Sequence, residues 1–284
     1  MMKKVKTYAK INLSLNVLGK TGGFHDLDTV VVSVDLSDEV TVRPRKDDKL
    51  CFTLKGIGEY SIFEEDNNAY KAAKLFKEEF GVSGADITVY KNIPLGGGLG
   101  GSSADIAGVL RAMALAFGVD DDLKPLADKL GSDSGYQLYG GLARLKGRGT
   151  EVELLDDIEP FWIVLAFLES GVNTADCFKV FDGEKNFALA NNEELIIDLY
   201  GAKLQNLGKN CLNGLTGAAE KLNGEIKGVL EKIKGLCPSA CSMSGSGSTV
   251  FAIFDTKELC LWAADKLKSM GINATAVKTV KRYG

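Results

Sequence analysis

The first part of the chain alternates apolar and polar residues. Residues 5–17, VKTYAKINLSLNV, follow this period of two and are predicted to form a β-strand. Glycines predict a turn at Gly19–Gly23, and the alternation returns in residues 27–36 and 38–45. The sequence therefore predicts three strands before the first helix.

Helical spacing replaces this alternation in residues 67–81, where an Asn precedes the apolar face and a Gly ends it. Residues 85–95 return to the pattern of a strand, and residues 104–118 have a second apolar helical face. A strand that leads through a glycine-rich segment into a helix is thus expected around residue 100.

The rest of the chain mixes the two patterns without a regular order. This favours an α+β fold over a doubly wound sheet. A boundary is expected near residue 155, which divides the chain into domains at residues 1–155 and 156–284. The further elements predicted are a short helix at 121–131, a loop at 132–141, a hairpin at 142–155, a buried strand at 160–168, a helix within 171–182, helices broken by glycines at 195–234, two strands around a glycine turn at 239–255, a helix at 258–271 and a strand at 273–280.

The composition is that of an ordinary globular protein and narrows the class of partner. The chain has 284 residues, of which 45% are hydrophobic and 25% are charged, and its formal net charge is −4. A protein that binds nucleic acid usually has a basic surplus that neutralises phosphates. A small-molecule partner is therefore expected, and no nucleic acid.

Neither the cysteines nor the apolar segments indicate secretion or a membrane. The six cysteines are scattered, which favours reduced thiols over a disulfide framework, and Cys237 and Cys241 lack neighbouring ligands for zinc. No apolar run has the length of a signal-peptide core or approaches the ~20 residues of a membrane span. The expected location is the cytoplasm, without a membrane partner.

The clearest chemical signal is the glycine-rich segment Pro94–Ser103, which reads PLGGGLGGSS. A helix N-terminus offers unpaired N–H groups and a partial positive charge, and glycines let the backbone approach a ligand closely. The segment therefore favours a cradle for the phosphates of a nucleotide, with the hydroxyl groups of Ser102 and Ser103 near a phosphate-bound Mg²⁺. A hinge or a tight turn is the alternative interpretation.

Several segments together resemble one enzyme family. The phosphate loop of the GHMP kinases is similar to PLGGGLGGSSADIA, and two later motifs of that family resemble LGSDSG and MSGSGSTVFAIF. The branch of the family that acts on 4-diphosphocytidyl-2-C-methyl-D-erythritol is similar to YAKINLSLNVLGKTGGFHDLDTV and to GVNTADCFKVFD. The resemblance covers nearly the whole chain, although Ser134–Gly135 replaces the Val–Pro of the family pattern.

This resemblance implies a two-lobed GHMP kinase fold. The N-terminal ATP-binding lobe, residues 1–155, would be related to ribosomal protein S5 domain 2, and the C-terminal substrate lobe, residues 156–284, would be ferredoxin-like. The implied activity is the ATP-dependent phosphorylation of the 2-hydroxyl of 4-diphosphocytidyl-2-C-methyl-D-erythritol in non-mevalonate isoprenoid biosynthesis, with Mg²⁺ accompanying the ATP. A monomer or weak homodimer is expected.

Two alternative functions stay open on the sequence. The first is another GHMP kinase, of mevalonate or homoserine type. The second is a catalytically silent regulator that binds a nucleotide on the same scaffold. Because Phe24, His25 and Phe178 would form a pocket for a cytidine group, that pocket argues against the first alternative.

The resemblance implies that Asp133 is the catalytic base and that Lys10 is its partner. A carboxylate can accept the proton of an alcohol, and a nearby ammonium stabilises the alkoxide and the phosphoryl charge. From the sequence alone, Asp133 is also explained as a turn residue. Lys10 is more unusual, because it lies within an apolar alternating segment.

The same resemblance implies a pocket for cytosine. His25, the only histidine in the chain, is expected to hydrogen-bond the ring, with Phe24 and Phe178 stacked on either side of it. Asn12 is expected near the reacting hydroxyl. The second glycine turn, which a plain hairpin explains nearly as well, is expected to close over the substrate and comprises Ser244, Gly245, Ser246 and Gly247.

The ATP site is implied residue by residue as well. Asn67 and Lys91 match positions near the adenine, and Asp105 lies just after the phosphate loop. The loop residues assigned to ATP are Pro94, Leu95, Gly96, Gly97, Gly98, Leu99, Gly100, Gly101, Ser102 and Ser103.

Overall fold

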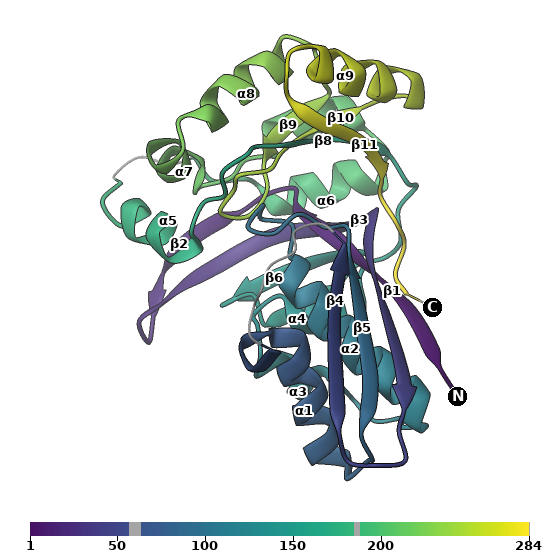
Figure 1. Cartoon of the computed structure of the whole chain (residues 1–284). Coiled ribbons are helices and arrows are strands. Elements are labelled where there is room, and N and C mark those ends of the chain that lie inside the picture. Colours follow the sequence, from purple (N-terminus) through teal and green to yellow (C-terminus); the bar gives the residue numbers. More distant parts are fainter. Residues whose placement is uncertain (57–63, 185–187, 284) are drawn as a thin grey trace.

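Two β-sheets and the helices that cover them form the computed structural model, which describes residues 1–56, 64–184 and 188–283 (Figure 1). This mixture of sheets and helices confirms the predicted α+β class. The strands are β1 (Lys3–Asn12), β2 (Asn16–Thr21), β3 (Phe24–Pro44), β4 (Leu50–Gly56), β5 (Ala85–Lys91), β6 (Leu142–Gly147), β7 (Glu151–Leu154), β8 (Trp162–Phe167), β9 (Ala240–Met243), β10 (Val250–Phe254) and β11 (Asn273–Lys278).

The helices lie on the outside of the sheets and between them (Figure 1). They are α1 (Asn68–Phe80), α2 (Gly101–Phe117), α3 (Lys124–Asp128), α4 (Ser134–Gln137), α5 (Thr174–Phe181), α6 (Asn192–Tyr200), α7 (Thr216–Leu222), α8 (Glu225–Lys234) and α9 (Lys257–Ser269), with 3₁₀ turns η1 (Glu64–Asp66) and η2 (Leu204–Lys209). No helix in the described part of the chain has both the length and the apolar character needed to cross a membrane.

The long strand β3 organises the first sheet. It pairs antiparallel with β1, β2, β5 and β6, while β4 pairs parallel with β5 and β7 pairs with β6. The segment Val30–Val34 is buried on both faces, because Val30 and Val32 face one core cluster and Val31 faces another. A run of valines suits such a strand, which must bury side chains on both sides.

Helices α1, α2 and α3 cover one part of the first sheet. Phe76 of α1 and Leu110 of α2 pack in one cluster with Val40 and Ile87 of the sheet. The α1 helix begins at Asn67, whose side chain accepts a 2.8 Å hydrogen bond from the N–H of Ala69. That bond satisfies one of the unpaired donors at the helix start, as the sequence predicted.

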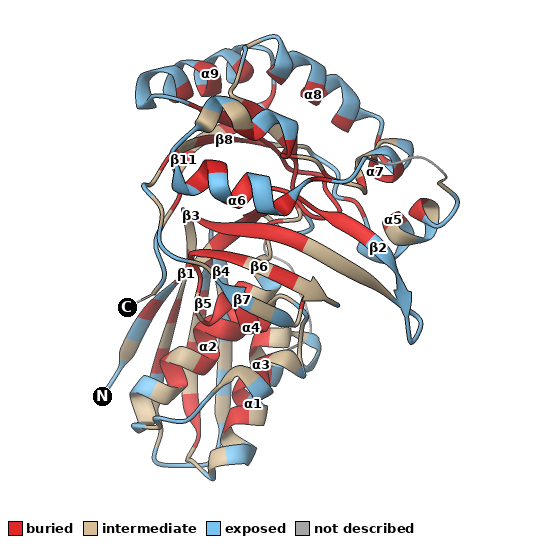
Figure 2. Ribbon diagram, turned by 180° about the vertical axis from the view of Figure 1, so that it is seen from behind, coloured by how far each residue is buried: buried red, intermediate tan, exposed pale blue. Residues whose placement is uncertain are grey.

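The second sheet has the strand order β11-β8-β10-β9 and lies between two layers of helix. On β8, Val164 and Ala166 face α8 and α9, whereas Ile163 and Leu165 face α6 and the first sheet. Figure 2 shows the resulting burial along β8 and along the middle of β3. The two sheets therefore share one apolar core, which holds the two halves of the molecule together.

Residue 155, near which the sequence predicts a domain boundary, lies between β7 of the first sheet and β8 of the second, and the division into domains stays a prediction. The first sheet contains strands within residues 3–154, and the second contains strands within residues 162–278. The C-terminal tail nevertheless returns to the first half of the chain, where Val280 N donates to Ser33 O of β3 and Tyr283 N donates to Tyr139 O after α4, both at 2.9 Å. The tail thus crosses the boundary that the sequence suggested.

Some local predictions were wrong. The two strands predicted at 27–36 and 38–45 are one strand, β3, because β1 pairs with it on both sides of an irregularity at Tyr8 and Ala9. The segment 132–141 contains the short helix α4 rather than loop alone, and β4 has no counterpart among the predicted strands. The turn expected at Gly19–Gly23 is shorter, because β2 continues to Thr21.

Candidate active site

A cavity of about 510 Å³ is lined by residues from both halves of the molecule. Its wall includes β1, the loop between β5 and α2, the segment before α4, the β6–β7 turn and the start of α5. The sequence-predicted residues in this wall are Lys10, Asn12, Pro94–Ser103, Asp133, Phe178, Gly245 and Ser246. The other predicted residues are not among the described residues that line this cavity: Phe24, His25, Asn67, Lys91, Asp105, Ser244 and Gly247.

The glycine loop has a backbone shape that only glycine adopts without strain. Gly96, Gly98 and Gly100 have φ angles of +68°, +73° and +70°. Gly100 is the N-cap of α2 and provides no side-chain cap, so the first N–H groups of this helix stay available. Among the described residues, the N–H groups of residues 96–100 donate no backbone hydrogen bond outside the regular elements. The loop can therefore donate several hydrogen bonds to an anion.

The second glycine turn packs directly onto this loop. Ser244 Oγ donates a 2.9 Å hydrogen bond to Gly98 O and accepts one of 3.2 Å from Asn12 N. Asn213 Nδ2 donates to Met243 O and to Gly245 O, both at 2.8 Å, and so holds the start of the turn. The structure thus brings together two glycine segments that lie far apart in the sequence.

Lys10 and Asp133 meet in the wall of the cavity. Lys10 lies on β1 and is only 5% exposed, and its Nζ lies 3.1 Å from Asp133 Oδ2. The same Nζ donates a 2.6 Å hydrogen bond to Asn12 Oδ1. Asp133 stands at the start of α4, where its carbonyl accepts a 3.0 Å hydrogen bond from Gln137 N. This pairing of a buried ammonium with a partly exposed carboxylate can deprotonate an alcohol and stabilise the charge that develops.

Lys91 and Asp105 lie behind the glycine loop and form part of a buried cluster. Lys91 Nζ pairs with Asp38 and, at 2.7 Å, with Asp105 Oδ2. Asp38 Oδ1 also accepts hydrogen bonds of 2.6 and 2.8 Å from the N–H groups of Asn92 and Ile93. The cluster therefore joins β3 and the end of β5 to α2, on either side of the loop. A role of Lys91 at the adenine stays a prediction.

The carboxyl group of Asp105 has too few partners for a buried charge. Its Oδ1 atom has no hydrogen-bond partner, and a second carboxylate, Asp38, shares its lysine. Burial, with the repulsion from Asp38, raises the pKa of Asp105 to about 7 despite the opposing attraction of Lys91. Asp105 thus tends to hold a proton while Asp38 accepts three hydrogen bonds.

The imidazole of His25 stacks on the ring of Phe178. The two ring centroids lie 4.4 Å apart with an interplanar angle of 25°. His25 Nε2 lies 2.8 Å from Asp182 Oδ1, and Lys20 Nζ lies 2.5 Å from Asp182 Oδ2. Hydrogen bonds from Lys20 and His25 hold the pKa of Asp182 below its ordinary value. The β2–β3 hairpin is thereby fastened to α5, next to the cavity wall at Phe178.

Phe24 lies beneath a cation, Arg148, that the sequence did not predict. The guanidinium carbon of Arg148 lies 3.4 Å from the centroid of the Phe24 ring, an arrangement that favours a cation–π contact. Arg148 comes from the β6–β7 turn and lines the cavity. Its position between Gly147 and Gly149 was a local signal that this side chain is exposed on a turn.

Two other residues of the site carried no signal in the sequence. Thr29 lines the cavity and is 2% exposed, and its role depends on β1 lying beside β3. Thr174 also lines the cavity, and its hydroxyl lies 2.9 Å from Ser246 Oγ of the second glycine turn. Such contacts arise only when distant segments pack together.

Fold, site and comparisons with known proteins together define a small-molecule kinase. Residues 67–142 match the family described as GHMP kinases N terminal domain, and residues 196–272 match the family described as GHMP kinases C terminal. The chain belongs to the GHMP kinase family, whose members are ATP-dependent kinases.

Relatives of nearly equal length are named for one substrate. The chain is 33% identical to 4-diphosphocytidyl-2-C-methyl-D-erythritol kinase of Clostridium beijerinckii, across 98% of this chain and 100% of that protein. It is 35% identical to the enzyme of the same name from Clostridium botulinum (strain Alaska E43), across 97% and 99%. A crystal structure of 4-(cytidine 5'-diphospho)-2C-methyl-D-erythritol kinase has a TM-score of 0.82 and 30% identity, across 98% and 99%. Homoserine kinase of Cytophaga hutchinsonii, at 20% identity, 99% and 95% coverage and a TM-score of 0.77, shares the fold.

Proposed function

We propose that this chain transfers the γ-phosphoryl group of ATP to the 2-hydroxyl of 4-diphosphocytidyl-2-C-methyl-D-erythritol. The names of relatives that match it over nearly their whole length support this substrate. The single observation that carries the chemistry is the 3.1 Å contact between Lys10 Nζ and Asp133 Oδ2, in a cavity that the glycine loop also lines.

In this proposal Asp133 accepts the proton of the attacking hydroxyl. Its side chain is 30% exposed, so a substrate can reach the carboxylate from the cavity. Lys10, which is almost fully buried, stabilises the alkoxide and the charge on the phosphoryl group. Phosphoryl transfer needs positioning and charge stabilisation more than covalent chemistry from the protein. The phosphoryl group therefore passes directly between the two substrates.

The N-terminal lobe, residues 1–155, is proposed to hold ATP. The phosphates would accept hydrogen bonds from the N–H groups of residues 96–103 at the positive end of α2. Mg²⁺ would neutralise phosphate charge when it is bound. In the described residues there is no group of three or more acidic, His or Cys side chains that could hold a metal. A Mg²⁺ ion that arrives with the nucleotide fits this donor set, with hydroxyl oxygens of Ser102 and Ser103 nearby.

The cytidine group is proposed to bind between the β2–β3 hairpin and α5. Phe178 presents an aromatic surface in the cavity wall, and the imidazole of His25 lies against that ring. Arg148, which also lines the cavity, lies over Phe24 and can attract the diphosphate of the substrate. This combination of aromatic rings with a cation favours a nucleotide-like alcohol over mevalonate or homoserine.

A coupled assay of ADP formation tests this function. The purified chain is supplied with ATP, Mg²⁺ and, in turn, the cytidine diphosphate ester, mevalonate and homoserine. We expect turnover with the cytidine ester at least a hundredfold above that with the other two alcohols. Preference for mevalonate or homoserine would reassign the substrate, and ATP binding without turnover on any alcohol would favour a regulator.

A further inference from the structure

The side-chain amide of Asn12 lies between Lys10 and Thr29. Its Oδ1 atom accepts the 2.6 Å hydrogen bond from Lys10 Nζ, and its Nδ2 atom donates a 2.8 Å hydrogen bond to Thr29 Oγ1. All three residues are at most 5% exposed. An amide has two ends of opposite hydrogen-bonding character, so a rotation by 180° would exchange acceptor and donor. The neighbours of Asn12 must therefore decide which end faces the lysine.

The hydroxyl of Thr29 can fix the orientation of the Asn12 amide, because its single proton is already donated to another acceptor. Thr29 Oγ1 donates a 2.5 Å hydrogen bond to the carbonyl oxygen of Ser14, and a carbonyl oxygen can only accept. Toward Asn12, Thr29 Oγ1 can then act only as an acceptor. The amide must turn its NH₂ group to Thr29, which leaves its oxygen facing Lys10.

The opposite orientation would place two donors against each other. The amide NH₂ would face the ammonium of Lys10, and the hydroxyl oxygen of Thr29 would face an amide oxygen without a proton between them. Hydrogen bonds to a charged group are stronger than neutral ones, and a buried donor left unpaired is destabilising. With the amide oriented as observed, Lys10 keeps its remaining N–H groups for Asp133 and the cavity.

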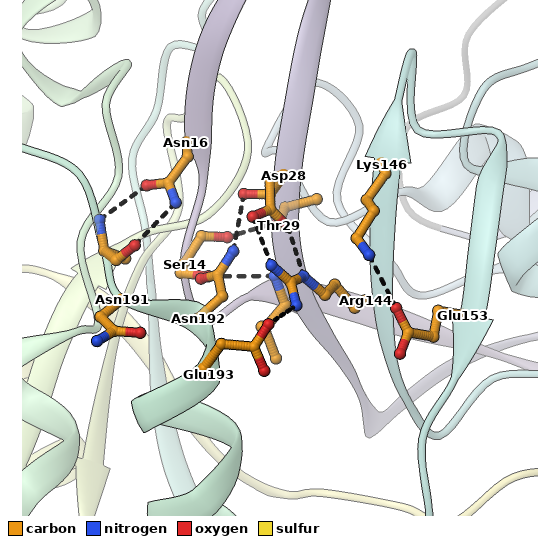
Figure 3. A network of polar contacts seen from close by, with 12 residues as sticks. Ser14, Asn16, Asp28, Thr29, Arg144, Lys146, Glu153, Asn191, Asn192 and Glu193 are labelled. Atoms are coloured by element: carbon orange, nitrogen blue, oxygen red, sulfur yellow. Dashed lines mark hydrogen bonds and ion pairs between the residues drawn. The ribbon is translucent and has the colours of Figure 1, made fainter.

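The Ser14 carbonyl is itself held in place by both halves of the molecule. Ser14 Oγ accepts a 3.1 Å hydrogen bond from Val30 N and donates one of 2.6 Å to Asn192 Oδ1 at the start of α6. Asn192 Nδ2 donates in turn to Asp28 O at 3.1 Å. Figure 3 shows this network, in which Arg144 also joins Asp28 to Glu193. The acceptor that fixes the Thr29 proton is thus anchored from β3 and from α6.

We propose that Thr29 is a positioning residue for phosphoryl transfer: its hydroxyl fixes the orientation of the Asn12 amide and thereby holds Lys10 toward Asp133. This inference rests on the proposed function, in which Lys10 and Asp133 act on the alcohol. Thr29 acts through Asn12, so its loss should weaken the chemical step more than the binding of ATP.

Thr29→Val tests this role, because valine keeps the shape and removes the hydroxyl. We expect kcat with the cytidine ester to fall roughly tenfold or more, while KM for ATP changes less than about twofold. Thr29→Ser should recover most of the lost kcat. Thr7→Val is the matched control, because Thr7 is fully buried and also donates to a carbonyl, that of Ala104 at 2.6 Å. It should reduce thermal stability to a similar extent without the loss of kcat.

A double-mutant cycle separates positioning through Asn12 from a general structural role. In an Asn12→Ala background, adding Thr29→Val should lower kcat by no more than about twofold, because the amide is already gone. Three results would overturn the inference. Thr29→Val could lower kcat equally in both backgrounds, Thr29→Val could have a normal kcat, or Thr7→Val could lose as much kcat as Thr29→Val. A wild-type chain that does not phosphorylate the cytidine ester would overturn the proposed function instead.

Discussion

The carbonyl oxygen of Ser244 lies against Gly98 so closely that a Cβ atom on Gly98 would come within 2.1 Å of it. Gly98 also has a φ angle of +73°, which side chains other than glycine rarely adopt. Two physical constraints, one of contact and one of backbone conformation, therefore apply at the place where the two glycine turns meet.

Gly98→Ala should separate the two turns and impair ATP binding. The added methyl group must displace the backbone of Ser244, which is not a flexible side chain end. We expect KM for ATP to rise at least tenfold, as measured by initial rates at varied ATP. Gly118→Ala is the matched control, because Gly118 has the same φ of +73° and open space around its Cβ position. It should cost about 1–2 kcal/mol of stability from backbone strain alone and leave KM for ATP unchanged.

Asp133→Asn should reduce turnover while ATP still binds. The amide keeps the size of the side chain but cannot accept the proton of the alcohol. We expect kcat to fall roughly a hundredfold or more, and calorimetric titration should give an ATP affinity close to that of the wild type. Turnover near the normal value would rule out Asp133 as the base.

Asp182→Ala should weaken the binding of the cytidine substrate. The carboxylate holds His25 and Lys20, at 2.8 and 2.5 Å, so its loss releases the hairpin that carries His25. We expect KM for the cytidine ester to rise about fivefold to tenfold, with little change in KM for ATP. Asp176→Ala removes an exposed carboxylate from the first turn of the same helix and serves as the control. Parallel changes in both KM values would contradict the assignment of this region to cytidine.

Asp105→Asn should change how stability depends on pH. The folded state raises the pKa of Asp105 to about 7 from an ordinary value of 3.8. Between these values the folded chain retains a proton that the unfolded chain has released, so the free energy of unfolding falls as the pH rises. The wild type should therefore lose more stability between pH 5 and pH 8 than Asp105→Asn does.

Urea unfolding at the two pH values measures this difference. Asp120→Asn removes the same formal charge from an exposed position and should leave the pH dependence parallel to that of the wild type. If the Asp105→Asn curve also ran parallel to the wild type, Asp105 would not be the group that takes up the proton.

The sequence predicted best those features that depend on neighbouring residues. The glycine loop was recognisable because a strand pattern precedes it and a helix pattern follows it, and the structure places α2 at Gly101–Phe117. The Asn67 cap and the buried strand β8 could likewise be predicted from the residues next to them in the sequence. Lys10 and Asp133 were singled out by resemblance, since nothing in their own surroundings distinguishes a catalytic pair from a lysine in a strand and an acid in a turn.

Features that depend on contacts between distant parts of the chain could not be predicted from neighbouring residues. The burial of Lys91 follows from its pairing with Asp38, which is 53 residues away in sequence. The continuity of β3 is imposed by four partner strands, although its own sequence predicted two strands divided at Ser37. Likewise, the stacking of His25 on Phe178 requires α5 to dock beside the hairpin.

Because β3 continues through the irregularity in its pairing with β1, it fixes the separation of groups that serve different tasks. It carries His25 near its start, Thr29 further along and Asp38 in its second half. Each residue advances a strand by roughly 3.3 Å and side chains alternate between faces, so deleting one residue between Thr29 and Val34, where the pairing is regular, would move Thr29 and turn its side chain to the other face. Natural variation in length should therefore accumulate at the hairpin tip, Gly22–Gly23, and be eliminated by selection inside the strand.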